Sequence, residues 1–300
     1  MQLASVRPVP RPVDTVIEFL EAEQARGVTH VLLDEGARDG LRNLLLRVRE
    51  AKTAQESPAP KPTPQLAQQS PTAPAPPQAI LAHVTAEGQT KTERLDSLRK
   101  QAETWPAARA LSTLRDTLVF STGNPDARIM FIGDPPGYEE EKKREPFIGP
   151  AGQKLTDILK AMGLEREDVY LSTIVKFRPS TPRQTTNNRK PSPEELAVCM
   201  PFIRAEIEIV RPTCIVAMGA TAAEGLLALP GTIAEMRGSW HEFDGVPVRV
   251  TYHPSYLLQT NASLTIKRQL WEDMLDVMVK LAMPISERQR GFFLPKSSAS

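Results

Sequence analysis

Four short apolar runs alternate with helical stretches in this chain, and this alternation constrains the fold more than any other feature. Each run is rich in β-branched residues and short enough to form a single strand. The runs are 128–133, 168–175, 213–219 and 246–253. One helical stretch between them opens with Ser192 and Glu195, the spacing of a capping box. The pattern predicts a three-layer α/β/α domain over residues 91–284, with a central, mainly parallel four-stranded sheet.

The segments on either side of this domain have a different composition. Residues 51–90 are rich in Pro, Ala and Gln and are predicted to be a disordered linker. Residues 1–50 contain amphipathic stretches and are predicted to form a small helical module. We interpret this module as a docking element for an unknown protein partner. The polar residues 285–300 are predicted to be a loose tail.

Composition excludes several classes of protein. The chain has no run of about 18 apolar residues and no apolar signal-peptide core, so we expect a soluble, cytoplasmic protein away from membranes. Lys and Arg number 37 against 36 Asp and Glu, so net charge does not by itself indicate a polyanionic partner. Two cysteines, Cys199 and Cys214, cannot form a disulfide framework or a four-thiolate metal site. We expect a monomer.

The residues that could bind a ligand or take part in a reaction lie at the ends of the four apolar runs. Ligands of open α/β sheets bind outside the carboxyl ends of the strands. The first run ends in Gly-Asp-Pro-Pro-Gly with Asp134, and the last ends in His253 followed by Pro and Ser. Phe147 follows the first turn, and the loop 176–190 has five Lys or Arg and no acid. We therefore expect a carboxylate, a histidine, an exposed Phe147 and a basic loop on one rim.

Each of these residues also has a purely structural interpretation. Asp134 would equally cap a turn, and His253 would equally be a satisfied histidine at a strand end. Phe147 would more often belong to a core, and a basic loop is often only solvated. Their convergence on one edge is what favours a functional site. No phosphate-loop fingerprint is present, so nucleotide binding is weakly supported.

Six segments of the chain resemble one known family. They are GDPPGYEEEKKREPFIGPAGQKL, VYLSTIVKFRP, KPSPEELAVCMPFI, VRPTCIVAMGATA, GSW and YHPSYLL. In order and spacing, over about residues 95–280, they resemble the bacterial and archaeal family 4 uracil-DNA glycosylases. The resemblance implies that a base is flipped out of DNA into a pocket and that its N-glycosidic bond is hydrolysed.

The resemblance also implies roles for individual residues. Asp134 stands where the family has a glutamate that orients water and stabilises the cationic sugar. His253 would donate a hydrogen bond to the uracil O2, and Phe147 would stack on the base. Contacts to the base are expected from Gly133, Pro135, Gly137 and Thr173. Contacts to DNA are expected from the basic residues Lys176 and Arg178 and from the loop residues Ser255, Tyr256 and Leu257.

The chain departs from the family at the metal ligands. Family members hold a four-iron, four-sulfur cluster on four cysteines. Those positions are Ala102, Trp105, Phe177 and Cys199 here. Because one thiolate cannot hold such a cluster, we expect neither an iron–sulfur cluster nor any other cofactor, with Trp105 and Phe177 filling the volume.

A second departure concerns recognition of the base. The family has an asparagine that pairs with the uracil edge, and this chain has Thr173, which can make only one such bond. Ser172 or Gln153 would be the neighbours able to compensate. Glu140 is either a second acid that assists water or a solvated charge. The loop 183–190 has no histidine, so a covalent histidine adduct with DNA is not expected.

Three functions remain open at this point. The first is a monofunctional glycosylase that removes uracil or a related deaminated base from DNA. The second is a degenerate member of the family that binds DNA or a partner and does little chemistry. The third is a small-molecule nucleotide-binding domain. The sequence favours the first, and it does not settle the damaged base or the preferred strand.

Overall fold

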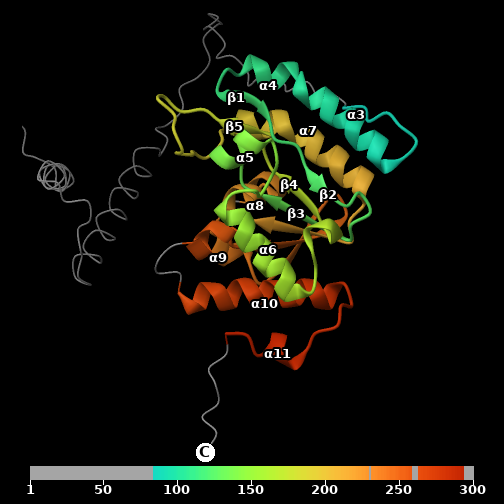
Figure 1. The fold of residues 1–300 in the computed structure, drawn as a ribbon, viewed down its shortest axis with the longest axis vertical. Helices are drawn as coiled ribbons and strands as arrows, with labels where there is room; N and C mark the ends of the chain where they lie inside the picture. The colour runs from blue at the N-terminus through green and yellow to red at the C-terminus, as the bar shows by residue number, and fades with distance from the viewer. Residues whose placement is uncertain (1–83, 230, 259–262, 294–300) are drawn as a thin grey trace, which may run out of the picture. The chain divides into compact units, whose positions relative to one another are not determined.

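The computed structural model describes residues 84–293 except 230 and 259–262, and Figure 1 shows their arrangement. The predicted N-terminal module, residues 1–50, and most of the predicted linker lie outside the described residues. Within the described residues, no helix is long and apolar enough to cross a membrane.

A six-stranded sheet forms the centre of the domain, in the order β2-β4-β3-β6-β8-β7. Its four central strands run parallel and coincide with the four apolar runs. They are β3 (Ile129–Gly133), β4 (Tyr170–Thr173), β6 (Cys214–Met218) and β8 (Val246–Thr251). The prediction of a mainly parallel α/β sheet is therefore confirmed.

Two antiparallel edge strands extend the predicted sheet. They are β2 (Thr122–Gly123) beside β4, and β7 (Trp240–Phe243) beside β8. The chain reverses between β7 and β8 through Asp244 and Gly245, both with positive φ (49° and 81°). Asp-Gly is a strong sequence signal for a tight hairpin, so β7 was detectable. A separate antiparallel pair joins β1 (Leu114–Leu118) to β5 (Phe177–Pro179).

Helices cover both faces of the sheet because the strands are apolar on both sides. Met130 and Ile132 of β3 face one core, and Ile129 and Phe131 face the other. The first core includes α3 (Lys91–Glu103), α4 (Pro106–Ala110), α7 (Pro193–Val210), α8 (Ala220–Leu227) and α9 (Ile233–Met236). The second includes α6 (Pro150–Met162) and α10 (Leu264–Lys280), which lie together on one side in Figure 1. These two layers complete the predicted α/β/α sandwich.

Local signals explain where the helices begin and end. Ser192 and Glu195 form the predicted capping box at the start of α7. Gly163, with φ of 80°, ends α6 in the left-handed conformation that favours glycine. The short elements that complete the chain are α5 (Tyr138–Lys143), α11 (Glu287–Arg290) and the 3₁₀ turns Arg166–Asp168 and Pro254–Leu258.

The segment 285–293 is more ordered than the predicted loose tail. The Trp271 indole N–H donates to the Gln289 carbonyl at 2.7 Å, and the Gln289 amide donates to the Ala161 carbonyl at 2.8 Å. Phe292 packs against Trp271, with ring centroids 5.2 Å apart. These contacts tie α11 to α6 and α10, which sequence polarity alone does not reveal.

Candidate active site

A pocket of about 510 Å³ opens at the carboxyl ends of the parallel strands. Asp134, Phe147, Thr173 and His253 all line it, as the sequence predicted for one rim. It lies where β3 and β6 are neighbours although β4 comes between them in the chain. Such a reversal in strand order leaves a crevice between the loops, and it is where α/β sheets bind ligands.

Asp134 lies directly after β3, against the start of α8. Its Oδ1 accepts a hydrogen bond from the Ala222 backbone N–H at 3.3 Å. Gly219 has a φ of 103°, and a Cβ there would lie 2.6 Å from the carboxylate, so a glycine is required. Burial raises the pKa of Asp134, although the His253 charge and the amide hydrogen bonds act in the opposite direction. A raised pKa makes the ionised carboxylate a stronger base.

His253 presents one defined nitrogen to the pocket. Its Nδ1 accepts from the Ser255 backbone N–H at 3.3 Å and lies 2.8 Å from the Ser255 hydroxyl. Because a backbone amide can only donate, Nδ1 carries no proton and the neutral ring carries it on Nε2. Burial lowers the pKa of His253, although Asp134 and Glu140 raise it. The site therefore offers a neutral imidazole as a hydrogen-bond donor.

Phe147 forms a flat wall beside this histidine, but the prediction that it is exposed is wrong. It is 4% exposed, because its ring packs into the core that α6 and α10 share. The two rings stack at a centroid distance of 6.0 Å and an angle of 24°. Phe147 has a φ of 55°, and Arg166 donates to its carbonyl at 3.1 Å, which fixes this backbone. A Cβ on Gly133 would lie 2.4 Å from the ring, and one on Gly152 would lie 1.6 Å from the Phe147 carbonyl oxygen. Gly133 thus makes room for the aromatic wall.

Glu140 joins the two loops that form the pocket mouth. Its Oε2 accepts from the Gly137 N–H at 3.1 Å, and its Oε1 accepts from the Gly149 N–H at 2.9 Å. Both oxygens are therefore engaged by backbone donors. Glu140 is therefore not merely a solvated charge; it positions the turn that contains Pro135 and Gly137.

Thr173 lines the pocket but does not replace the pairing of an asparagine. Its hydroxyl donates to the Val175 carbonyl at 2.9 Å. Ser172 is fully buried and donates to Glu206, away from the pocket. Gln153 is exposed on α6, outside the set of residues that line the pocket. Neither neighbour compensates for the missing carboxamide.

The prediction that Lys176 and Arg178 contact DNA is wrong. Lys176 is fully buried, and its ammonium donates to both oxygens of Glu206 at 2.9 and 2.8 Å. Arg178 is 2% exposed and pairs with Glu141 at 2.9 Å. Because a buried, paired cation cannot reach a phosphate, neither side chain contributes to a DNA surface.

In the loop after β8, the exposed residues differ from those that the sequence predicted to contact DNA. Tyr256 is exposed, whereas Leu257 packs inward against the core of α6 and α10. Leu258 is 43% exposed and lines the pocket together with Ser255. Sequence reasoning named Leu257 and missed Leu258, because the run Tyr-Leu-Leu alone does not distinguish the two leucines. It also gave no individual role to Thr221 and Asn188, which line the pocket from α8 and from the loop after β5.

Comparison with known proteins assigns this arrangement to a family. The uracil DNA glycosylase superfamily model matches residues 120–275. A type-4 uracil-DNA glycosylase from Thermotoga maritima is 44% identical over 53% of this chain and 81% of its own length. One from Archaeoglobus fulgidus is 38% identical over 49% of this chain and 75% of its own. A type-5 uracil-DNA glycosylase from Pyrobaculum aerophilum is 32% identical over 48% and 69%.

The expectation that the protein has no cofactor is contradicted by these relatives, because type-4 enzymes are iron–sulfur proteins. The four side chains at the ligand positions nevertheless do not fit a cluster held by four cysteines. Ala102 and Phe177 are buried in an apolar core, and Trp105 packs edge-on against Phe202 at 5.0 Å. Cys199 supplies one thiol, and burial raises its pKa to about 11, so it stays protonated.

The matched region contains all six strands of the central sheet and every residue that we place in the pocket. The matches cover three quarters or more of the two type-4 relatives. The chain therefore belongs to the uracil-DNA glycosylase superfamily and, within it, to family 4.

Proposed function

We propose that this protein removes uracil from DNA by hydrolysing the bond between the base and its deoxyribose, which leaves an abasic site. The observation that carries the proposal is the placement of Asp134, Phe147 and His253 around one pocket. The two relatives named above are type-4 uracil-DNA glycosylases. DNA is accordingly the substrate, with the target nucleotide flipped into the pocket.

Asp134 is proposed to act on the sugar side of the reaction. As the C1′–N1 bond breaks, the electron pair leaves with the base and positive charge develops on the sugar. The Asp134 carboxylate stabilises that charge and accepts a proton from the water that attacks C1′. Its raised pKa favours this proton transfer, and aspartate is one methylene shorter than the family's glutamate.

His253 and Phe147 are proposed to act on the base side. The Nε2–H of neutral His253 donates to the uracil O2 as the leaving base becomes an anion. A preorganised donor of this kind is worth about 3 kcal/mol in the transition state. The Phe147 ring stacks on the base and lies nearly parallel to the imidazole. Since one chain supplies all three groups, a monomer is sufficient.

The experiment is single-turnover release of uracil from single-stranded and duplex DNA, with the wild-type protein beside Asp134→Ala and His253→Ala. We expect the wild-type protein to release uracil and His253→Ala to do so about 100-fold more slowly. Asp134→Ala should lose at least as much. Absence of release by the wild-type protein at high enzyme concentration, with salt-sensitive DNA binding retained, would refute the proposal and favour a binding role. The cytoplasmic location and the docking role of residues 1–50 stay predictions.

A further inference from the structure

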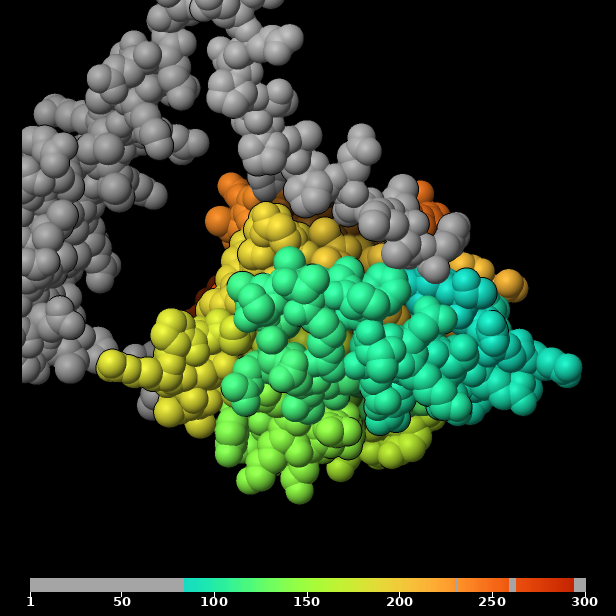
Figure 2. Space-filling model, turned by 90° about the horizontal axis from the view of Figure 1, so that it is seen from above, coloured from blue at the N-terminus to red at the C-terminus, as the bar shows by residue number. Residues whose placement is uncertain are grey.

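The pocket contains a carboxamide that the sequence comparison with family 4 does not assign. Thr173 occupies the position of the base-pairing asparagine, and its hydroxyl is bonded to the backbone. Among the described residues that line the pocket, Asn188 is the one Asn or Gln. It lies in the loop between β5 and α7, which projects from the domain as the yellow segment in Figures 1 and 2.

The orientation of the Asn188 amide is fixed by Arg178. The Arg178 Nε–H donates to the Asn188 Oδ1 at 3.0 Å. A guanidinium has no acceptor, so the oxygen must face it and the NH₂ group must face away. The Nδ2 atom lies beside Gly137 of the pocket turn, 3.2 Å from where a Cβ on that residue would be. Within the described residues, no acceptor takes a hydrogen bond from this nitrogen.

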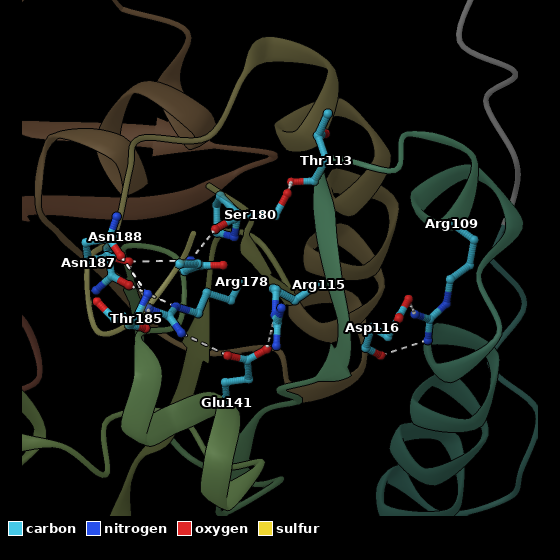
Figure 3. Close-up of polar contacts among 12 residues, drawn as sticks. Arg109, Thr113, Arg115, Asp116, Glu141, Arg178, Ser180, Thr185, Asn187 and Asn188 are labelled. Atoms are coloured by element: carbon cyan, nitrogen blue, oxygen red, sulfur yellow. Dashed lines mark hydrogen bonds and ion pairs between the residues drawn. The ribbon is translucent and has the colours of Figure 1, made fainter. Parts of the chain in front are cut away.

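Arg178 is itself held firmly, as Figure 3 shows. It donates to Glu141 at 2.9 Å and to the carbonyls of Thr185 and Asn187 at 3.0 and 2.8 Å. Glu141 also accepts from Arg115 at 2.9 Å. Burial acts to raise the pKa of Glu141, but the bonds from the two arginines outweigh it and lower the pKa. These bonds fix Arg178, and through it they restrain the exposed side chain of Asn188.

We propose that Asn188 recognises the flipped base by donating from Nδ2 to the O4 carbonyl oxygen, because O2 is the oxygen that His253 binds in the proposed function. The inference rests on the proposed function and names a specificity-determining residue for it. Uracil presents only carbonyl oxygens as exocyclic groups, whereas cytosine presents an amino group at one of those positions. A fixed N–H donor therefore attracts uracil and meets a second donor on cytosine. Arg178 is the positioning residue, and Glu141 supports it.

The test uses the full-length protein and two DNA probes in a fluorescence anisotropy titration. One oligonucleotide carries 2′-deoxypseudouridine, which keeps both carbonyls of uracil on a bond that cannot be hydrolysed. The other carries a tetrahydrofuran abasic site, which has no base. We expect Asn188→Ala to weaken binding of the pseudouridine DNA about 10-fold and to leave abasic-site binding unchanged.

Two further variants separate recognition from structural support. Asn188→Asp keeps an acceptor for Arg178 but turns an oxygen toward the pocket, so binding should be no better than for Asn188→Ala. Asn187→Ala is the matched control, because its side chain bonds Thr181 and Thr185 within the loop and is not part of the pocket lining. It should bind both probes as the wild-type protein does.

Several outcomes would overturn the inference. Restored binding in Asn188→Asp would show that the residue only supports Arg178, and equal losses on both probes would show a contact to the DNA backbone. A wild-type protein without preference for the pseudouridine probe would also overturn it. Uracil release separates the two proposals: release by the wild-type protein with Asn188→Ala at the same rate refutes this inference alone. No release by the wild-type protein refutes the proposed function.

Discussion

The buried pair of Lys176 and Glu206 allows a quantitative test of the fold. Both side chains are fully buried, and Glu206 also accepts from the hydroxyls of Ser172 at 2.7 Å and Ser121 at 2.9 Å. Lys176→Met leaves the carboxylate without its cation, and Glu206→Leu leaves the ammonium without its anion. Each single change should lower the free energy of unfolding by ~3–5 kcal/mol, because an unpaired charge stays buried.

The double variant should lower the free energy of unfolding by far less than the sum of the two single changes. Lys176→Met combined with Glu206→Leu removes both charges together and leaves apolar groups of similar volume. We expect it to be about 2–3 kcal/mol more stable than additivity of the single changes requires. For a domain of this size, 1 kcal/mol corresponds to roughly 2–4 °C in Tm, so the single variants should melt ~6–20 °C lower.

Urea denaturation followed by tryptophan fluorescence measures these free energies. Additive single and double changes would refute the argument, since they would mean that the two charges do not interact. DNA binding provides an independent check of the buried placement. The double variant should keep the wild-type dependence of binding on salt, and a slope smaller by about one would show that Lys176 contacts a phosphate.

Two further predictions concern the pocket. Burial raises the pKa of Asp134, so the folded state favours the neutral acid. The stability that neutral Asp134 contributes is therefore fully present below the unfolded pKa of about 4. This stability is lost as the pH rises through the folded pKa. Asp134→Asn should therefore raise Tm at pH 7, lose that gain below about pH 4 and abolish uracil release; a lower Tm at pH 7 contradicts this. Glu140→Gln can accept from only one of Gly137 and Gly149, so uracil release should fall about 10-fold while binding to abasic-site DNA is kept. Loss of abasic-site binding to the same extent would show that Glu140 supports the DNA surface instead.

The sequence predicted the part of the site that depends on strand order. Asp134 and His253 each follow an apolar run, and parallel strands bring their carboxyl ends to one edge. Phe147 follows the Asp134 turn closely enough to share that edge. These placements need only local pattern and topology, so they could be predicted without knowing any side-chain contact.

The sequence did not predict that the basic residues after β4 are buried and paired with carboxylates. Lys176 pairs with Glu206, thirty positions away, and Arg178 pairs with Glu141, thirty-seven positions away. A basic loop without nearby acids in the sequence predicts an exposed phosphate-binding segment. The carboxylates that pair with these two residues come close only in the folded chain. The same limit hid Asn188, since its orientation depends on an arginine whose own partner lies on α5.

The acidic stretch that follows the Asp134 turn gives the clearest example of this limit. Glu140 and Glu141 are consecutive on the short helix α5, so their side chains leave it in directions about 100° apart. Glu140 reaches the backbone of the turn and of the start of α6, and Glu141 reaches Arg178 and through it the Asn188 loop. Residues that appear to be solvated charges in the sequence therefore fix the positions of the Gly137 turn and of the Asn188 loop, which lie side by side in the pocket lining.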